Sequence, residues 1–531
     1  MSEQEINFDL ISAGLEAQKE EKFQQENAER YDLSRPSSIN GVKVSPTIQE
    51  NEEKVSKTVK AKDIIKQNVK RLYYTSENQA YAKVEISGTE EILSFDSAIF
   101  NYWVTSLFES AFGGVLGRDE LRNAKRSVES TAYFKGYLKD IHLRIAEHND
   151  SIYLDLANKQ GEILEIDKNG FRVIKDSPVI FRRTPDMAEL PTPILRNETD
   201  YQLLGKYLNV RNVDDFNMII AFILGTFKPS MPKPILNLTG EAGTGKSMNT
   251  RLIRMFIDPA KQKDLLKKEI NEEELINASY NQYLMAFDNM SGISSQGSDL
   301  LCVVSTGGSF SKRKLYTDSD EIIVSLKKSV ILNGIDDIAK KQDLVSRTIF
   351  IDTPPLADDK KRTEAEIWAD FKKDYPYILG SLVNAVHTGI KNDGLDKSSY
   401  PRMIDFGRFI QNASPALGWD IDYWQKTYIK NQRDGIEQSI ESDPFASALV
   451  DLMEDIKRLG LTTWRGTATE LLEKLAKFVP EDETFYNNAW PKSNKVKSRL
   501  RRISPLLKDR DIIWQYGREN GKNIYTFNQL L

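Results

Sequence analysis

The spacing of hydrophobic and polar residues changes character several times along the chain. Between residues 61 and 195, short alternating runs are typical of strands, and one longer stretch has the helical period. The predicted strands are Tyr81–Ile86, Ile152–Leu156, Glu162–Ile166 and Phe171–Ile174, the predicted helix is Phe95–Phe112, and Asn169-Gly170 is a predicted hairpin turn. We expect these elements to form one small α+β domain that carries no catalytic constellation.

A second pattern, in which apolar strands alternate with helices, extends from residue 196 to about 355, and a helical pattern follows in residues 356–435. Strands that alternate with helices pair in parallel, so we expect a parallel sheet wrapped by helices. The predicted strands lie in the runs Pro234–Thr239, Tyr283–Asn289, Lys328–Gly334 and Asp343–Ile351, and three later helices, Glu364–Phe371, Ile378–Ile390 and Arg402–Gln411, predict a helical lid.

The last pattern, in residues 440–531, combines helices with a terminal hairpin. The predicted helices are Pro444–Leu459, Thr467–Phe478 and a basic helix from Ser493 to about Ile503, which stops short of Pro505. The predicted hairpin strands are Ile512–Tyr516 and Asn523–Phe527, with Asn520-Gly521 in the turn. This order of elements is that of a winged helix-turn-helix domain.

The first 60 residues are polar and charge-dense, with one short helix expected around Gly14–Arg30, and they predict a flexible arm or linker. A partner-binding tail is the alternative. The 531-residue chain has a net charge of only −5, one cysteine and three histidines, which excludes a disulfide framework and a Cys/His zinc cluster. No apolar run is long enough to span a bilayer, and the start is no signal peptide, so we expect a cytoplasmic protein without membrane partners.

Candidate chemistry begins with a glycine-rich segment between a predicted strand and a predicted helix. Its residues are Gly240, Glu241, Ala242, Gly243, Thr244, Gly245, Lys246 and Ser247. Such a loop turns its backbone N–H groups toward phosphates, while the lysine reaches the β- and γ-phosphates and the serine hydroxyl holds Mg²⁺. The segment predicts that the protein binds a nucleoside triphosphate, ATP, with Mg²⁺. The competing interpretation is a glycine-rich surface turn.

Three polar residues at the ends of predicted strands extend this site. Asp288 ends an apolar strand, where its carboxylate would help to fix Mg²⁺. Asn333 ends another and could orient the attacking water, although an Asn-Gly turn gives the same pattern. Arg347 precedes a strand and could reach a neighbouring subunit's phosphoryl group as an arginine finger; a surface arginine in a local ion pair is the alternative.

Taken in this order, the segments resemble an AAA+ ATPase of the superfamily-3 and MCM-like clade, and most closely the helicase-like replication proteins of phages, prophages and mobile islands. The resemblance extends from about residue 61 to the end. It depends most on Phe287–Asn289, Ser305–Phe310, Lys312–Glu321, Ile331–Ile335, Asp343–Arg347, Thr353–Leu356 and Trp490–Ser493. It implies that Gly245, Lys246 and Ser247 are Walker A, Asp288 is Walker B, Asn333 is sensor 1, Arg347 is the finger in trans and Arg402 is sensor 2.

One residue departs from the pattern of many AAA+ enzymes. Where they carry a glutamate after the Walker B aspartate, this chain has Asn289. An amide can position water but cannot accept its proton, and because phosphoryl transfer depends mostly on positioning and electrostatics, hydrolysis is not excluded. The catalytic base therefore stays unassigned, with Glu241 and Asp299 as weak candidates.

Two basic segments are candidates for DNA contacts. A predicted β-hairpin carries Lys312, Arg313 and Lys314 on one flank, and the resemblance implies that it lines a central pore; a solvated charge run is the alternative. Between Trp490 and Lys522, ten basic residues face three acidic ones. The candidate DNA contacts in this second segment are Lys495, Lys497, Arg499, Arg501, Arg502, Arg518 and Lys522. A protein-docking winged helix is the alternative.

Together these patterns predict an α/β protein: an AAA+ P-loop ATPase core with a helical lid, preceded by a small α+β domain and followed by a winged helix. The predicted function is that of an ATP-dependent DNA helicase and replication initiator, acting as a homo-oligomer, most simply a hexamer, on single-stranded and forked DNA with other replication proteins of its element. A non-translocating AAA+ regulatory or defence ATPase is the second interpretation. A primase–helicase fusion ranks last, because residues 61–195 lack a metal-binding acidic motif.

Overall fold

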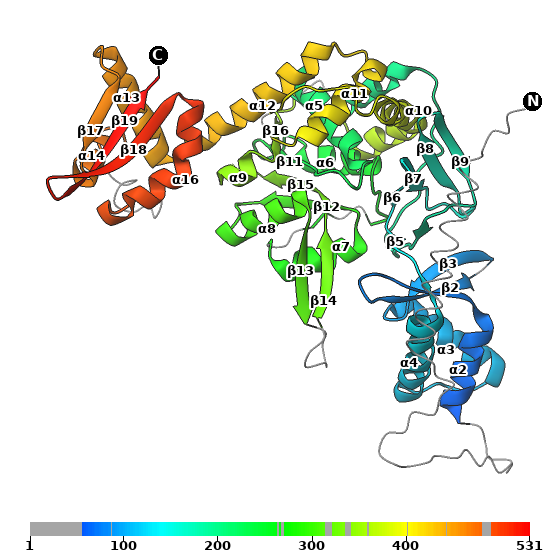
Figure 1. Cartoon of the computed structure of the whole chain (residues 1–531). Coiled ribbons are helices and arrows are strands. Elements are labelled where there is room, and N and C mark those ends of the chain that lie inside the picture. Colours follow the sequence, from blue (N-terminus) through cyan, green and yellow to red (C-terminus); the bar gives the residue numbers. More distant parts are fainter. Residues whose placement is uncertain are drawn as a thin grey trace, which may run out of the picture. The chain divides into compact units, whose positions relative to one another are not determined.

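The computed structural model describes residues 56–530, except for residues 87, 263–264, 267–269, 314–320, 335–340, 358–360, 401, 442 and 480–489. The predicted N-terminal arm and its helix lie outside these residues. The chain divides into two compact units, Met1–Asp140 and Ile141–Leu531 (Figure 1). No helix within the described ranges combines the length and the apolar character needed to cross a bilayer.

The first unit is an antiparallel sheet backed by helices. Its strand order is β3-β2-β1-β4, with β4 pairing in parallel with β1. Residues Ala80, Ala82 and Val84 of one strand alternate toward the helices and are almost fully buried, as expected for a sheet with one covered face. The elements are α2 (Lys57–Asn68), β1 (Val69–Tyr74), β2 (Ala80–Ile86), β3 (Thr89–Ser94), α3 (Ala98–Phe112), α4 (Arg118–Lys135) and β4 (Tyr137–Leu138).

The second unit begins with a four-stranded antiparallel sheet of order β6-β7-β8-β9. Inward residues of this sheet, such as Leu154 and Ile166, belong to the same hydrophobic core as the central parallel sheet. The boundary between units therefore falls at Asp140, inside the segment 61–195 that the sequence predicts as one domain. The elements are β5 (Ile141–His142), β6 (Ile145–His148), β7 (Ser151–Asp155), β8 (Ile163–Asp167), β9 (Gly170–Ile174) and β10 (Ile180–Phe181).

Arg144 fastens this antiparallel sheet to the rest of the unit. Its fully buried side chain donates to the carbonyl oxygens of Asp155 and Ala188 and forms an ion pair with Asp258. Burying a guanidinium is costly unless its donors are paired, so these contacts hold the segments together as a group.

The centre of the second unit is the predicted parallel sheet, which the structure confirms, with strand order β12-β15-β11-β16. Every residue of β11 and β15 is buried, which explains their continuous apolar runs. The elements are η1 (Glu198–Lys206), α5 (Val213–Thr226), β11 (Ile235–Thr239), α6 (Lys246–Met255), α7 (Glu272–Asn281), β12 (Leu284–Met290), α8 (Ser295–Thr306), β13 (Gly308–Arg313), β14 (Glu321–Leu326), β15 (Ser329–Gly334), α9 (Gln342–Val345) and β16 (Thr348–Asp352).

Three helices follow the sheet: α10 (Glu364–Lys391), α11 (Ile404–Leu417) and α12 (Ile421–Glu441). Figure 1 shows them gathered with α5 beside the parallel sheet. The first runs without interruption through Pro376, where the sequence predicts two helices. Burial of Phe371, Tyr375 and Ile378 on one side keeps the helix continuous across a residue that lacks an N–H donor.

The C-terminal elements form a helical group with a three-stranded sheet of order β17-β19-β18. The sequence did not predict β17, which is only four residues long, and it ended the basic helix before Pro505, through which α16 in fact runs. The elements are α13 (Pro444–Arg458), β17 (Thr463–Gly466), α14 (Ala468–Leu475), η3 (Ser493–Lys495), α16 (Val496–Asp509), β18 (Ile512–Glu519) and β19 (Lys522–Gln529).

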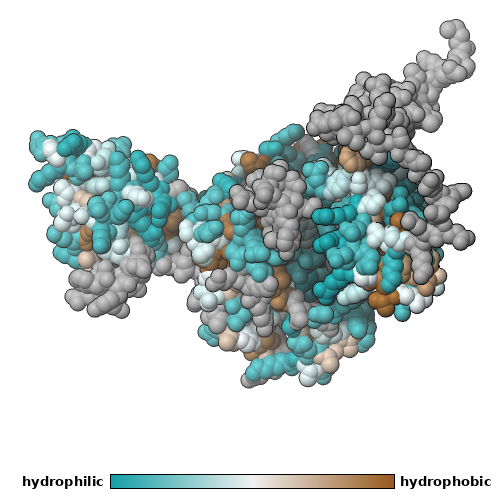
Figure 2. All heavy atoms as spheres, turned by 90° about the horizontal axis from the view of Figure 1, so that it is seen from below, coloured by the Kyte–Doolittle hydropathy of each residue, from teal (hydrophilic) through white to brown (hydrophobic). Residues whose placement is uncertain are grey.

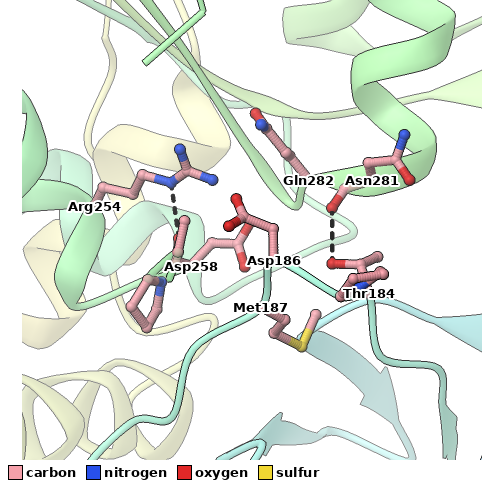
Figure 3. Close-up of a pocket in the computed structure, with 10 residues that line it drawn as sticks. Thr184, Asp186, Met187, Arg254, Asp258, Asn281 and Gln282 are labelled. Carbon is pink, nitrogen blue, oxygen red and sulfur yellow. Dashed lines mark hydrogen bonds between the residues drawn. The ribbon is translucent and has the colours of Figure 1, made fainter. Parts of the chain in front are cut away.

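Hydrophilic residues predominate on the face of the molecule shown in Figure 2.

Candidate functional site

The glycine-rich loop joins the carboxyl end of β11 to the first residue of α6. Gly240, Gly243 and Gly245 have φ values of 147°, 82° and 84°, a region that side chains other than glycine rarely adopt. A Cβ atom on Gly240 would lie 2.5 Å from the carbonyl oxygen of Thr353. The loop is therefore sharply turned against a neighbouring strand, and the N-terminus of α6 opens onto it, which is the geometry of an anion site.

Lys246 lies along this loop. Its Nζ donates to the carbonyl oxygens of Gly240 and Glu241, each at 2.7 Å. Burial lowers the pKa of Lys246, while the charge of Asp288 acts in the opposite direction. The ammonium is thus held at the mouth of the loop, where a phosphate would meet it.

Ser247 and Asp288, which are 41 residues apart, meet at this point. The Ser247 Oγ donates to Oδ1 of Asp288 at 2.8 Å. A hydroxyl and a carboxylate are the protein ligands expected for Mg²⁺ beside a triphosphate. The described residues contain no group of three or more acidic, histidine or cysteine side chains suited to a metal ion, so Mg²⁺ here would need phosphate oxygens and water to complete its shell.

Asn289 and Asn333 are joined across the strand ends. Asn289 has φ 56°, and the pairing of β12 with β15 shifts register around it. Its backbone N–H donates to Oδ1 of Asn333 at 2.9 Å, and Nδ2 of Asn333 donates to Thr250 of α6 at 2.9 Å. Because both ends of the amide are bonded and the residue is 1% exposed, Asn333 has a fixed orientation between the acidic strand and the helix.

Two hydrogen-bonded asparagines, Asn209 and Asn249, contact the glycine loop; we call them the asparagine clasp. Asn209 and Asn249 exchange two hydrogen bonds, and Nδ2 of Asn209 also reaches the carbonyl oxygens of Thr244 and Pro354. The sequence analysis missed this clasp. The residues lie in separate segments and carry no spacing signal, so only the fold brings them together.

Arg347 and Arg402 both contact Asp343, away from the glycine loop of their own chain. Arg347 precedes β16, and β16 pairs in parallel with β11, Thr348 opposite Ile235. Arg347 therefore lies at the amino ends of the strands, whereas the glycine loop lies at the carboxyl ends. Arg347 forms an ion pair with Asp343, and Nη2 of Arg402 reaches the same carboxylate at 3.3 Å.

The two weak candidates for a catalytic base differ in their surroundings. Glu241 is exposed within the glycine loop. Asp299 lies in α8 and forms an ion pair with Lys341 at 2.7 Å. Neither the exposure of Glu241 nor the ion pair of Asp299 identifies a proton acceptor for the attacking water.

The C-terminal basic residues divide into exposed and engaged groups. The exposed candidates are Lys495, Arg501, Arg502, Arg518 and Lys522. Arg499 forms an ion pair with Asp443, the N-cap of α13, and Lys497 lies 3.5 Å from the centre of the Tyr516 ring. Arg499 is thus bonded within the domain, which argues against its predicted contact with DNA.

The predicted basic hairpin is present as β13 and β14, which pair from Gly308 with Leu326 to Arg313 with Glu321. Lys312 and Arg313 are in the paired strand. Lys314 and the acidic turn lie outside the described residues.

Two family models match the chain. Residues 201–422 match the model described as "Actinomycete integrative conjugative element replication protein", and residues 445–530 match the "AICE RepA C-terminal domain". Together the matches cover more than half of the chain and include the glycine loop, both arginines and the basic helix. The two matched ranges are thus similar to this family of replication proteins. The predicted kinship with replication proteins of mobile elements is confirmed at this level, and the matches leave residues 1–200, 423–444 and 531 uncovered.

Other comparisons add little to this AICE RepA assignment. No curated protein matches the chain. Among solved structures, the A form of the apo NrS-1 C-terminal region is 10% identical, with 88% of this chain and 98% of that chain covered and a TM-score of 0.39. A second apo structure of that region is 9% identical, with 90% and 100% covered and a TM-score of 0.37. Scores this low establish no common fold.

Proposed function

We propose that this replication protein is an ATP-dependent DNA helicase and initiator, which forms a hexameric ring, hydrolyses ATP with Mg²⁺ at its subunit interfaces and unwinds DNA of a mobile element. The hydrogen bond between Ser247 and Asp288 carries this proposal. It joins the two residue types that hold Mg²⁺ in P-loop ATPases, directly beside a glycine loop with the required backbone turns.

The central sheet would then be an AAA+ core, with Gly240–Ser247 as Walker A and Asp288 as Walker B. Asn333 would be sensor 1, since its amide bridges the acidic strand and α6. Asn289 replaces a glutamate but occupies a strained backbone position at the same strand end. Its side chain would position water, while the proton acceptor stays unassigned.

Hydrolysis in this proposal needs a second copy of the chain. Arg347 lies at the sheet edge away from its own glycine loop, so it would stabilise the transferring phosphoryl group of a neighbour. Such a head-to-tail contact closes into a ring when the rotation per subunit divides a full turn.

DNA would be held by the C-terminal domain, proposed as a winged helix, and by the β13–β14 hairpin. Arg501 and Arg502 are consecutive exposed residues of α16, and Arg518 and Lys522 lie at the tip of the following hairpin. A basic helix with a basic hairpin beside it suits groove entry with backbone contacts.

A second candidate function is a non-translocating AAA+ switch whose winged helix docks a protein. Asn289 favours it, because slow hydrolysis suits a switch better than a motor. The exposed basic face of α16 favours the DNA-binding motor.

Strand displacement on a forked duplex separates the two candidates. We expect the wild type to displace the strand with ATP and Mg²⁺, and Lys246→Ala to abolish displacement while leaving fork binding intact. ATPase activity that single-stranded DNA does not stimulate, with no displaced strand, would reject the helicase and favour the switch.

A further inference from the structure

We infer that Asp343 is a positioning residue, which holds Arg347 and Arg402 side by side as one receptor for the terminal phosphate of ATP bound to a second copy of the chain. The inference rests on the proposed function, and it assigns a role to a carboxylate that the motifs leave without one. Arg347 follows α9 and Arg402 precedes α11, 55 residues further along the chain, and both contact this carboxylate.

The charges of this cluster do not balance. Two guanidinium groups share one carboxylate, so a net positive charge remains and an added anion would be attracted. Nη1 of Arg347 also donates to the carbonyl oxygen of Asp343 at 2.7 Å, so this nitrogen contacts both the backbone and the carboxylate of Asp343. The side chain of Arg347 is 11% exposed, whereas those of Arg402 and Asp343 are 42% and 60% exposed, so the cluster faces outward.

The carboxylate is held in its ionised form. Burial alone would raise the pKa of Asp343, but the hydrogen bond and charge of Arg347, a hydrogen bond from Cys302 and the charge of Arg402 lower it. Without that negative charge, the two guanidinium groups that contact Asp343 would repel each other and separate.

The backbone beside Arg402 supplies independent support. Met403 is buried and has φ 53°, although it is neither glycine nor asparagine, and it forms the N-cap of α11 without a side-chain hydrogen bond. A residue in this conformation is strained, and such strain is concentrated at functional sites. The strained residue directly follows Arg402, whose side chain contacts Asp343.

The location of the cluster determines which phosphate it can meet. It lies at the amino ends of β11 and β16, separated from the glycine loop of the same chain by the length of β16, about 13 Å for its four residue steps. The cluster therefore suits the phosphate of another copy.

The inference is tested with Asp343→Asn in the full chain, which keeps the size of the side chain and removes its charge. We expect kcat for ATP to fall on the order of tenfold while KM changes less than about twofold, because each chain binds ATP with its own glycine loop. The matched control is Asp393→Asn, which breaks the exposed ion pair with Lys228 and should leave kcat unchanged. Equal melting temperatures of the variants exclude misfolding.

Mixing experiments then show on which side of the interface Asp343 acts. Asp343→Asn mixed with Lys246→Ala should regain part of its ATPase activity, because Lys246→Ala chains present an intact receptor to intact loops. Recovery for Arg347→Ala with Lys246→Ala, but none for Asp343→Asn with Lys246→Ala, would overturn the inference and leave the proposed function standing. If neither mixture recovers, the shared site itself fails, and the inference fails with it. A rise in KM for ATP without a fall in kcat would also contradict the inference.

Discussion

Lys233 is an unusual residue because its ammonium group is buried. Only 2% of it is exposed, and its Nζ donates to the carbonyl oxygens of Pro229 and Met231, which precede β11. Burial, together with the neighbouring charges of Lys327 and Lys328, lowers its pKa to about 7, against an opposing effect of Glu147. A lysine in this setting makes the stability of the sheet depend on pH.

The expected pH dependence has a definite sign. In the unfolded chain Lys233 keeps its proton up to about pH 10.5, whereas in the folded chain it loses it near pH 7. Between these values the unfolded state binds more protons, so the free energy of unfolding rises with pH by at most about 1.4 kcal/mol per unit. Lys233→Met should remove this rise. Thermal unfolding of both proteins between pH 7 and 9 measures it, and parallel curves would contradict the burial of the charge.

Among the elements, the glycine loop gives the most direct test of backbone geometry. Gly240→Ala places a Cβ atom 2.5 Å from the carbonyl oxygen of Thr353 at a φ of 147°. We expect ATP affinity to fall by about tenfold or more, since the loop must open to relieve the contact. Gly521→Ala is the control, because its φ is also positive, 80°, but no atom lies within 4 Å. Nucleotide titration with a fluorescent ATP analogue compares the two, and equal affinities would contradict the role of the turn.

The basic helix α16 offers a matched pair of arginines. Arg501 is exposed, whereas Arg499 forms an ion pair with Asp443. We expect Arg501→Ala to weaken duplex binding and to reduce the slope of log affinity against log salt by about one unit, as for one lost phosphate contact. Arg499→Ala should instead lower the melting temperature, because it removes the partner of the α13 N-cap. Fluorescence anisotropy over a salt series and thermal unfolding separate the two effects. If Arg499→Ala weakened duplex binding and Arg501→Ala did not, the ion pair between Arg499 and Asp443 would have to open on DNA.

The elements show where local sequence is sufficient and where it is not. The strand before Gly240 and the acidic end of β12 were predictable, because both signals lie within a few consecutive residues. The shared contact of Arg347 and Arg402 with Asp343 was not, since no sequence spacing connects α9 with α11. Pro505 illustrates a different limit: a proline lowers the odds of a helix, but burial of Ile503, Leu506 and Leu507 keeps α16 intact.

For the whole molecule, the boundary at Asp140 predicts which truncations fold. A chain that begins at Ile141 keeps the β6–β9 sheet and Arg144, so it should fold and bind ATP like the full chain. A chain that begins at residue 196 loses Leu154, Leu164 and Ile166 from the shared core and leaves Asp258 without its arginine. We expect that shorter chain to aggregate or to melt at a much lower temperature. Comparable melting of both truncations would place the boundary near residue 195, as the sequence alone suggests.

The contact of Lys246 with the carbonyl oxygens of Gly240 and Glu241 has a kinetic consequence. If the proposed function holds, an arriving triphosphate would have to replace these bonds with its own. Binding would then have two steps: a fast encounter, followed by a movement of the ammonium whose rate does not depend on nucleotide concentration. The observed rate of nucleotide binding would therefore level off at high ATP concentration, because the movement of the ammonium would limit it.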